Sequence, residues 1–501
     1  MMSGSQNISS VKSVSDISSA EDLAQFGYGQ ELRRELGPFA SFASGFSFVS
    51  ILSTIFELFA TGYGFGGPLF FWTWPIVFIG QFSTALCFAE LAASYPVAGA
   101  VYQWSRRLSN DSIGWFAGWF MLIGYIMSVA AIAIAMQSVL PSVWSGFQII
   151  GGDTAVGSPT GAANAVILGT ATIFICSLIS SLGVRATATA TAIGVYCEII
   201  GLVILLVVLF THTSRGPSVV MGGGVPAPTF WSFLSSTLMA AYVMYGFDSA
   251  AELSEETNNP RRTTPKAIIQ CLLVSFFGGA LMVMAALMAA PSLTDGNLAK
   301  DGVSYVLASV TSGFSGHILF AMVAISILSA TLAIQNAAAR VMFSMARDNR
   351  LPLSFFLTRV SARTATPWIA TLAVTVMAIS LLWVSYGDPA IFSALCSVTT
   401  VTIYFAYLLV TLPMLILRIK GINPVSGGME YFYLGRRKGL FVNIVSVVIG
   451  IILLVNVAWP RLSVFDPGNT HWYLHYFPII FMFFGSVSGF IVYKYKHKQN
   501  I

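Results

Sequence analysis

The sequence predicts an all-α polytopic membrane protein with 12 transmembrane helices. Only 9% of the 501 residues are charged and 56% are hydrophobic, whereas soluble domains are about 25% charged. Apolar runs of about 20 residues, long enough to cross a bilayer, recur along the chain. Basic residues are concentrated in alternate gaps between these runs. The pattern excludes an ordinary soluble enzyme, and it excludes a β-barrel, which would show short alternating segments.

The chain begins with a polar, Ser-rich tail, residues 1–37, for which we expect disorder and no cleavable signal peptide. Glycine, proline and charged residues then delimit the apolar runs. The predicted spans are centred near residues 52, 80, 127, 171, 199, 241, 278, 324, 377, 403, 450 and 482. The first ten form a core over 38–417, a cytoplasmic loop and the last two helices occupy 418–494, and 495–501 form a short C-terminus.

The basic residues predict the orientation. With a cytoplasmic N-terminus, 22 of the 25 Lys and Arg residues lie inside, and only Arg215, Lys300 and Arg461 lie outside. Cytoplasmic loops of membrane proteins carry such an excess. We therefore expect a multi-pass protein of the plasma membrane with both termini in the cytoplasm. The net charge of +5 then reflects topology, and no nucleic-acid partner is predicted.

Two spans carry unusual polar side chains. The first, residues 39–67, contains Ser47, Ser50, Ser53, Thr54 and Glu57. The sixth, residues 230–252, contains Ser235, Ser236, Thr237, Gly246, Asp248 and Ser249. Interrupted, polar spans at corresponding positions are typical of transporters built from two inverted repeats around a site near the middle of the bilayer. We predict five-helix repeats over about 38–211 and 230–417.

Three loops carry recognisable motifs. The second span ends in A-E-L-A-A-S-Y-P-V-A-G-A-V-Y at 89–102. The sixth carries G-F-D at 246–248, followed by E-E-T-N-N-P-R-R-T-T-P-K-A-I at 255–268. The eighth leads into R-V-M-F-S-M-A-R-D-N-R-L-P at 340–352. In this order the three motifs resemble those of the amino acid/polyamine/organocation transporter family.

Two further motifs indicate one branch of that family. The stretches F-G-Y-G-Q-E-L-R-R at 26–34 and W-F-A-G-W-F at 115–120 resemble the branch that handles amino acids, choline and γ-aminobutyrate. The resemblance implies a LeuT-like fold, a 5+5 inverted repeat plus two C-terminal helices, with helices 1 and 6 discontinuous around the substrate. Where relatives often have glycines beside the position of Ser50, this chain has Val49 and Ile51, so unwinding costs more.

The same resemblance implies a substrate site. Unwound half-helices expose backbone N–H groups that suit a carboxylate, and carbonyl groups that suit an ammonium or a cation. The substrate-binding candidates in this chain are Ser47, Ser50, Ser53, Thr54, Tyr242, Gly246 and Asp248. The serines have an alternative role, because small polar residues also let membrane helices pack closely. Tyr242 either closes over the ligand and stacks on its cationic group or packs between helices.

Three acids inside predicted spans are candidates for proton coupling. A carboxylate at the bilayer centre costs at least about 2.5 kcal/mol, so each needs a cavity or a partner. Asp248 matches a family position that lines the substrate pathway and can hold a proton; its alternative is a solvated place near the cytoplasmic mouth with Glu252. Glu198 lies where some proton-coupled relatives place a lysine; its alternative is a neutral acid bonded to a neighbouring helix. Glu57 has no basic residue nearby in sequence and needs water, a proton or a cationic ligand.

The eighth span offers a candidate cation site. Ser326 and Ser329 are three residues apart and share a helix face, as a small site of hydroxyls and carbonyls requires. Packing serines are the alternative. We expect Arg340 at the cytoplasmic end to pair with Glu255 or Glu256. No catalytic residue, metal site or cofactor is predicted, because the five cysteines stand singly and no phosphate-binding loop occurs.

Together these features predict a secondary active transporter rather than an enzyme. It would import a small amino acid or related organic amine by alternating access, coupled to protons. Its partners would be that substrate, H⁺ and the lipid bilayer. The alternatives are a substrate exchanger, sodium coupling, a choline, polyamine or γ-aminobutyrate permease, and a membrane sensor of the same fold that does not transport.

Overall fold

The computed structural model describes residues 23–24, 27–29, 31–311, 314–387, 390–425, 431–465 and 472–499. Regular structure in these residues is helical, apart from an isolated bridge between Leu36 and Thr257. The predicted disorder of the tail falls largely on residues 1–22, which lie outside the described residues. The fold is therefore all-α over the part of the chain that is described.

The helices follow the order that the apolar runs predict. The first predicted half contains α2 (Pro38–Val49), α3 (Ile51–Gly66), α4 (Thr73–Ser94), α5 (Ala100–Leu108), α6 (Asp111–Ile134), α7 (Leu140–Val143), α8 (Pro159–Ser181) and α9 (Val184–Thr211). The second contains α10 (Phe230–Val243), α11 (Ser249–Glu252), α12 (Pro260–Ala289), α13 (Asn297–Val310), α14 (Phe314–Arg347), α15 (Ser354–Leu357), α16 (Trp368–Val384) and α17 (Ala390–Ile419). The remaining helices are α18 (Arg436–Ala458), α19 (Leu462–Phe465), α20 (Trp472–His475) and α21 (Phe477–Gln499). Short 3₁₀ turns are η1 (Gly67–Trp72), η2 (Ala135–Ser138), η3 (Ser145–Phe147), η4 (Pro217–Met221) and η5 (Ser254–Glu256).

Nine stretches of the described chain are long and apolar enough to cross a membrane. The longest, Pro38–Ser94, contains α2, α3 and α4, and the apolar helices α10 and α16 are shorter than these stretches. Helix α9 exposes large apolar side chains along its length, such as Ile193, Ile200 and Val207. A row of apolar side chains on the outside of a helix bundle suits lipid rather than water. The protein is therefore an all-helical, multi-pass membrane protein.

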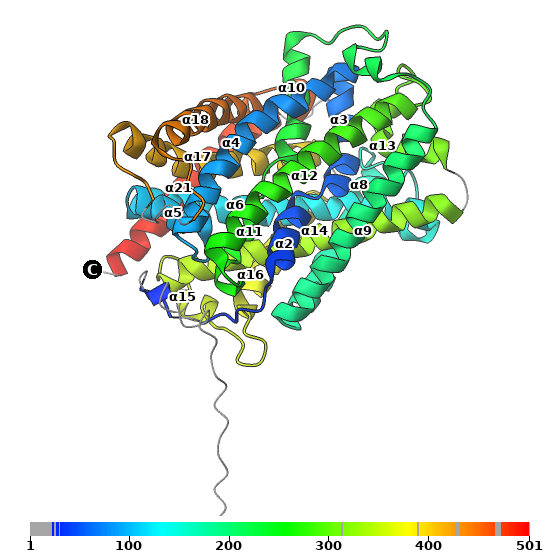
Figure 1. The fold of residues 1–501 in the computed structure, drawn as a ribbon. Coiled ribbons are helices and arrows are strands. Elements are labelled where there is room, and N and C mark those ends of the chain that lie inside the picture. Colours follow the sequence, from blue (N-terminus) through cyan, green and yellow to red (C-terminus); the bar gives the residue numbers. More distant parts are fainter. Residues whose placement is uncertain are drawn as a thin grey trace, which may run out of the picture.

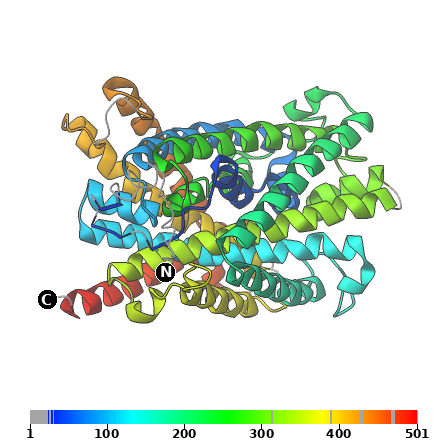
Figure 2. The same cartoon turned by 60° about the horizontal axis from the view of Figure 1, so that its bottom comes forward.

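Helices at corresponding places in the two predicted halves pack against each other. Helix α3 packs on α10, α4 on α12, α6 on α14, and α8 on α16. Helix α9 contacts α2, α12 and α14, and α17 contacts α6 and α18. Figure 1 shows α2 beside α12 and α9, and Figure 2 shows the dark blue α2 and α3 enclosed by helices from later in the chain. The first span thus lies in the interior, in contact with both halves.

The first span is broken at Ser50. This residue separates α2 from α3 with a φ of 33° and a ψ of 92°. A positive φ is strained for a residue other than glycine. The Thr54 hydroxyl donates to the Ser50 carbonyl at 2.6 Å, and the Ser50 N–H donates to the Phe46 carbonyl at 2.8 Å. These bonds satisfy part of the backbone at the break.

The sixth span is broken between α10 and α11. The chain leaves the helix at Met244 and turns through Gly246, which has a φ of 88°. A Cβ atom at Gly246 would lie 1.9 Å from a ring carbon of Phe48 in α2. Glycine is therefore required here both by the backbone conformation and by the close approach of Phe48. The two breaks lie against each other in the interior of the molecule.

Candidate functional site

A buried carboxylate lies at the start of α3. Glu198 of α9 is fully buried, and its Oε1 accepts hydrogen bonds from the Ser50 hydroxyl at 3.0 Å and from the Leu52 backbone N–H at 3.2 Å. The first N–H groups of a helix have no partner within the helix and carry partial positive charge, so they stabilise a carboxylate. The other oxygen, Oε2, has no hydrogen-bond partner among the described residues. Glu198 is therefore held at the helix break by one of its two oxygens.

Serine hydroxyls of α2, α3 and α14 pair with one another near the break, where that of Ser50 donates to Glu198. The Oγ of Ser50 lies 2.6 Å from that of Ser53 and 3.1 Å from that of Ser326 in α14. The Oγ atoms of Ser47 and Ser329 are 2.7 Å apart. We call this group the Glu198 cluster: Ser47, Ser50, Ser53, Glu198, Ser326 and Ser329. The structure thus brings the first-span serines, one coupling candidate and the candidate cation site together, while Thr54 bonds the carbonyl at the break instead.

A second cluster holds the α10–α11 break. Asp248 is fully buried; its Oδ2 accepts a hydrogen bond from the Tyr125 hydroxyl at 2.6 Å, and its Oδ1 accepts one from the Tyr407 hydroxyl. The Tyr407 oxygen in turn accepts the Gly246 N–H at 2.9 Å. Helices α6 and α17 therefore fix the break through Asp248. The alternative that Asp248 is solvated beside Glu252 is wrong, because both side chains are fully buried.

Glu57 lies apart from both clusters. Its side chain is 7% exposed; Oε1 is 3.8 Å from the Cys396 thiol, and Oε2 has no hydrogen-bond partner among the described residues. Tyr242 of α10 is close enough to interact electrostatically with Glu57, and its ring packs edge-on against Tyr245 at 5.3 Å. Tyr242 therefore belongs with Glu57 and not with Asp248.

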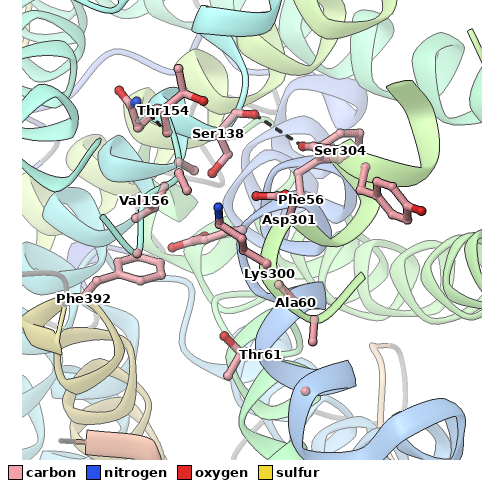
Figure 3. A pocket seen from close by; sticks show the side chains of 18 of the residues that line it. Phe56, Ala60, Thr61, Ser138, Thr154, Val156, Lys300, Asp301, Ser304 and Phe392 are labelled. Atoms are coloured by element: carbon pink, nitrogen blue, oxygen red, sulfur yellow. Dashed lines mark hydrogen bonds between the residues drawn. The ribbon is translucent and has the colours of Figure 1, made fainter. Parts of the chain in front are cut away.

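A cavity of about 680 Å³ opens beside Glu57. Its walls come from α3, from the chain between the end of α6 and the start of α8, from α13, and from residues of α17 and α19. Figure 3 shows Lys300 and Asp301 of α13 near Ser138 and Thr154 on the facing wall. Residues 47–54 are not part of its lining. The cavity therefore ends at Phe56 and Glu57, before the Glu198 cluster.

Ion pairs close the end of the molecule opposite the cavity opening. This end carries most of the basic residues, and we call it the basic end. Arg340 of α14 pairs with Glu256 at 2.9 Å, and Arg347 pairs with Glu255 at 2.8 Å. None of these side chains is more than 9% exposed. The predicted pairing of Arg340 is confirmed. The pairs join the segment after α11 to α14.

The segment before α2 strengthens this closure. The Tyr28 hydroxyl donates to Asp348 at 2.9 Å, and the Arg347 guanidinium lies 4.0 Å from the centre of the Tyr28 ring. Tyr102 and Arg106 also donate to Asp348, each at 2.7 Å. Burial, together with the Asp348 carboxylate, raises the pKa of Tyr28, so its hydroxyl remains a donor at neutral pH.

The sequence analysis missed three residues that contact the predicted acids: Tyr125, Tyr407 and Cys396. The two tyrosines are polar groups inside apolar spans, which is a visible signal. Their common partner Asp248, however, is 123 and 159 residues away in sequence. Cys396 is one of the five cysteines that stand singly in the sequence, and it is buried.

Two broken spans with buried acids at the breaks, in a helical membrane protein with a cavity reaching inward, are typical of secondary transporters. Residues 36–484 match the family model described as amino acid permease. This chain belongs to the amino acid permease family. The match confirms the amino acid/polyamine/organocation family that the loop motifs resemble.

Curated relatives are similar along most of the chain. Amino-acid permease BAT1 of Arabidopsis thaliana is 24% identical over 473 residues, 87% of this chain and 88% of the relative. The branched-chain amino acid permease BcaP of Bacillus subtilis is 26% identical over 419 residues, 80% of this chain and 85% of the relative. Amino-acid permease 2 of Neurospora crassa is 26% identical over 426 residues, which are 81% of this chain and 77% of the relative. These relatives and the family model support an amino acid transporter.

Proposed function

We propose that this protein imports a small amino acid across the plasma membrane by alternating access and couples that import to protons. The observation that carries the proposal is the bond between Glu198 and the start of α3. Protonation would cancel the carboxylate charge that holds the Leu52 N–H, because the neutral acid is a weaker acceptor. The N–H groups at the break would then be released for a substrate carboxylate. One proton would thus control the place where the substrate binds.

Asp248 is the second coupling candidate. It accepts hydrogen bonds from two tyrosine hydroxyls on different helices. A neutral carboxyl group is a weaker hydrogen-bond acceptor than a carboxylate, so protonation would weaken the contacts with α6 and α17. Protonation of Asp248 would therefore loosen the α10–α11 break. The carbonyls near Gly246 would then become available to a substrate ammonium.

The one-sided opening supports alternating access. The cavity beside Glu57 opens away from the basic end, where Arg340, Arg347 and their partners close the molecule. Because cytoplasmic loops carry the basic residues, the structure corresponds in this proposal to a state open to the outside. Transport then requires these ion pairs to separate while the cavity closes.

The helix packing supports a LeuT-like arrangement with 12 spans. Counterpart helices of the two halves pack together in four of the five positions, which is compatible with two inverted five-helix repeats. The nine apolar stretches become twelve spans when Pro38–Ser94 is divided between the first two and the shorter α10 and α16 are included. Helices α18 and α21 then follow the repeats, and both termini lie in the cytoplasm.

Uptake into proteoliposomes tests the proposal. A labelled panel of amino acids, γ-aminobutyrate, choline and polyamines is offered with and without an inward proton gradient. We expect one class, the amino acids, to accumulate above equilibrium only with the gradient. Uptake that requires preloaded unlabelled substrate would instead make the protein an exchanger. Uptake of none of the panel would favour the sensor.

A further inference from the structure

We infer that Glu57 selects substrates that carry an ammonium group at the end of an alkyl chain, such as a lysine-like amino acid or a diamine. The inference rests on the proposed transport function, since it assigns the substrate class at the end of the same cavity. It starts from the burial of Glu57. This carboxyl group is 7% exposed, one of its oxygens has no hydrogen-bond partner, and the described residues hold no cationic side chain in an ion pair with it.

A buried carboxyl group without a cationic partner is unfavourable on its own. Burial removes water that would otherwise solvate the charge, and the neutral donors beside it, the Tyr242 hydroxyl and the Cys396 thiol at 3.8 Å, leave Oε2 without a partner. A cationic group that entered the cavity would supply both the missing charge and the missing donors. Glu57 therefore needs a proton or a cation, and the cavity allows a cationic group to reach it.

The net charge of the cavity lining favours a cation. Three acids, Glu57, Asp153 and Asp301, line it together with a single basic residue, Lys300. Lys300 lies 3.6 Å from Asp153, and both are more than half exposed, so this pair is at the mouth. Clefts lined mainly by one sign of charge concentrate ions of the opposite sign. A cation would thus be drawn inward from the mouth to Glu57.

The spacing on α3 sets the length of the substrate. Leu52, at the break, and Glu57 are five residues apart in one helix, which corresponds to about 7.5 Å along its axis. An extended lysine spans a similar distance from its carboxylate to its terminal ammonium. Once protonation of Glu198 frees the N–H groups and the cavity extends past Phe56 to the break, those N–H groups would hold the carboxylate and Glu57 would hold the terminal ammonium. The Tyr242 hydroxyl bonds Glu57 and holds its carboxyl group in place for that cation.

Competition in proteoliposomes tests the inference on the wild-type protein. Lysine and norleucine differ only in the terminal amino group, so each competes against the labelled amino acid that the panel identifies. We expect lysine to compete at a concentration at least tenfold lower than norleucine. Equal competition, or stronger competition by norleucine, overturns the inference but leaves amino acid transport standing. Uptake of no amino acid overturns the proposed function and this inference with it.

Two variants locate the selection at Glu57. Glu57→Gln removes the charge and keeps the size, so the preference for lysine over norleucine should fall at least tenfold. Asp301→Asn makes the same change at the mouth, where solvent screens the charge, and should change that preference less than threefold. If both variants reduce the preference equally, general acidity selects the substrate and the inference fails. Size-exclusion chromatography verifies folding, and if Glu57→Gln does not fold, the wild-type comparison decides.

Competition by a diamine shows whether the ammonium group that Glu57 binds belongs to a lysine-like amino acid or to a diamine. Cadaverine has the alkyl chain and the terminal ammonium of lysine and lacks the carboxylate. Competition by cadaverine as strong as that by lysine would identify diamines as substrates. Competition at least tenfold weaker would show that the carboxylate is bound as well, as the spacing on α3 predicts. Either cadaverine result can be interpreted only if the wild-type protein prefers lysine to norleucine.

Discussion

At the residue scale, Ser50 combines a strained backbone with a useful side chain. Its φ of 33° disfavours any residue other than glycine, yet its hydroxyl bonds Glu198 at 3.0 Å and lies near two other serine hydroxyls. The hydroxyl contacts offset the strain that glycine would avoid. At Ser50 the backbone conformation favours glycine, whereas the hydrogen bonds of the side chain favour serine.

Two substitutions at Ser50 separate these demands. Ser50→Ala loses the hydroxyl and keeps the strain, whereas Ser50→Gly loses the hydroxyl and relieves it. We expect the alanine variant to be less stable than the glycine variant by about 1 kcal/mol, the usual cost of a left-handed conformation for a residue with a Cβ. Thermal unfolding of the purified variants in detergent measures the difference. Equal stability, or a more stable alanine variant, would show that the backbone at Ser50 is not strained.

The candidate acids were predictable from sequence at this scale, because a carboxyl group inside an apolar run is conspicuous. Glu57, Glu198 and Asp248 are all buried in the structure. Their partners were not predictable. The contact from Tyr407 to Asp248 joins residues 159 positions apart, and no local pattern encodes it. The identity of a partner depends on packing that a single sequence does not display.

At the element scale, the basic end is held by pairs between α14 and the segment after α11. The side chains of Arg340 and Glu256 are 3% and 1% exposed, so the charge of each is stabilised by the other rather than by water. Removing one member of such a pair leaves an unpaired buried charge and costs about 3–5 kcal/mol, while replacing both members costs much less. The pair therefore gives a clear test of how the two elements are joined.

A double substitution makes this test. Arg340→Met alone should strongly lower the unfolding temperature, because the Glu256 carboxylate stays buried without its partner. Adding Glu256→Gln should recover part of the loss. Thermal unfolding of the two variants beside the wild type measures both effects. A double variant less stable than Arg340→Met would mean that the two residues act independently.

The helix breaks were partly predictable at this scale. Polar residues marked the first and sixth spans, and glycine at position 246 is visible as a residue that permits a positive φ. The location of the first break at Ser50 itself had no glycine to mark it. It depends on hydroxyl and carboxylate contacts from α9 and α14, which come together only in the folded bundle. Sequence therefore indicated the broken spans but not the contacts that hold them.

At the scale of the whole molecule, the two ends differ. One end admits a cavity of about 680 Å³ as far as Glu57, and the other is closed by buried ion pairs. The Glu198 cluster lies between α3, α9 and α14, and Asp248 joins the α10–α11 break to α6 and α17. Acids at both breaks are thus bonded to helices around them. A change in their protonation would alter contacts between helices and not only within one site.

The sequence predicted the family, the membrane class and the order of the helices, since each depends on motifs or on runs of apolar residues. It did not predict the cavity. The cavity wall combines α3, the segment before α8 and α13, which are distant in the chain. A surface formed by segments so far apart is a property of packing.

The central claim is that a buried acid at a helix break couples transport to protons. The most direct test compares amino acid accumulation driven by an inward proton gradient in the wild type, Glu198→Gln and Asp248→Asn, each reconstituted at equal density. The account predicts gradient-driven accumulation in the wild type and its loss in at least one variant, while exchange of preloaded substrate remains measurable. Full gradient-driven accumulation in both variants would contradict it.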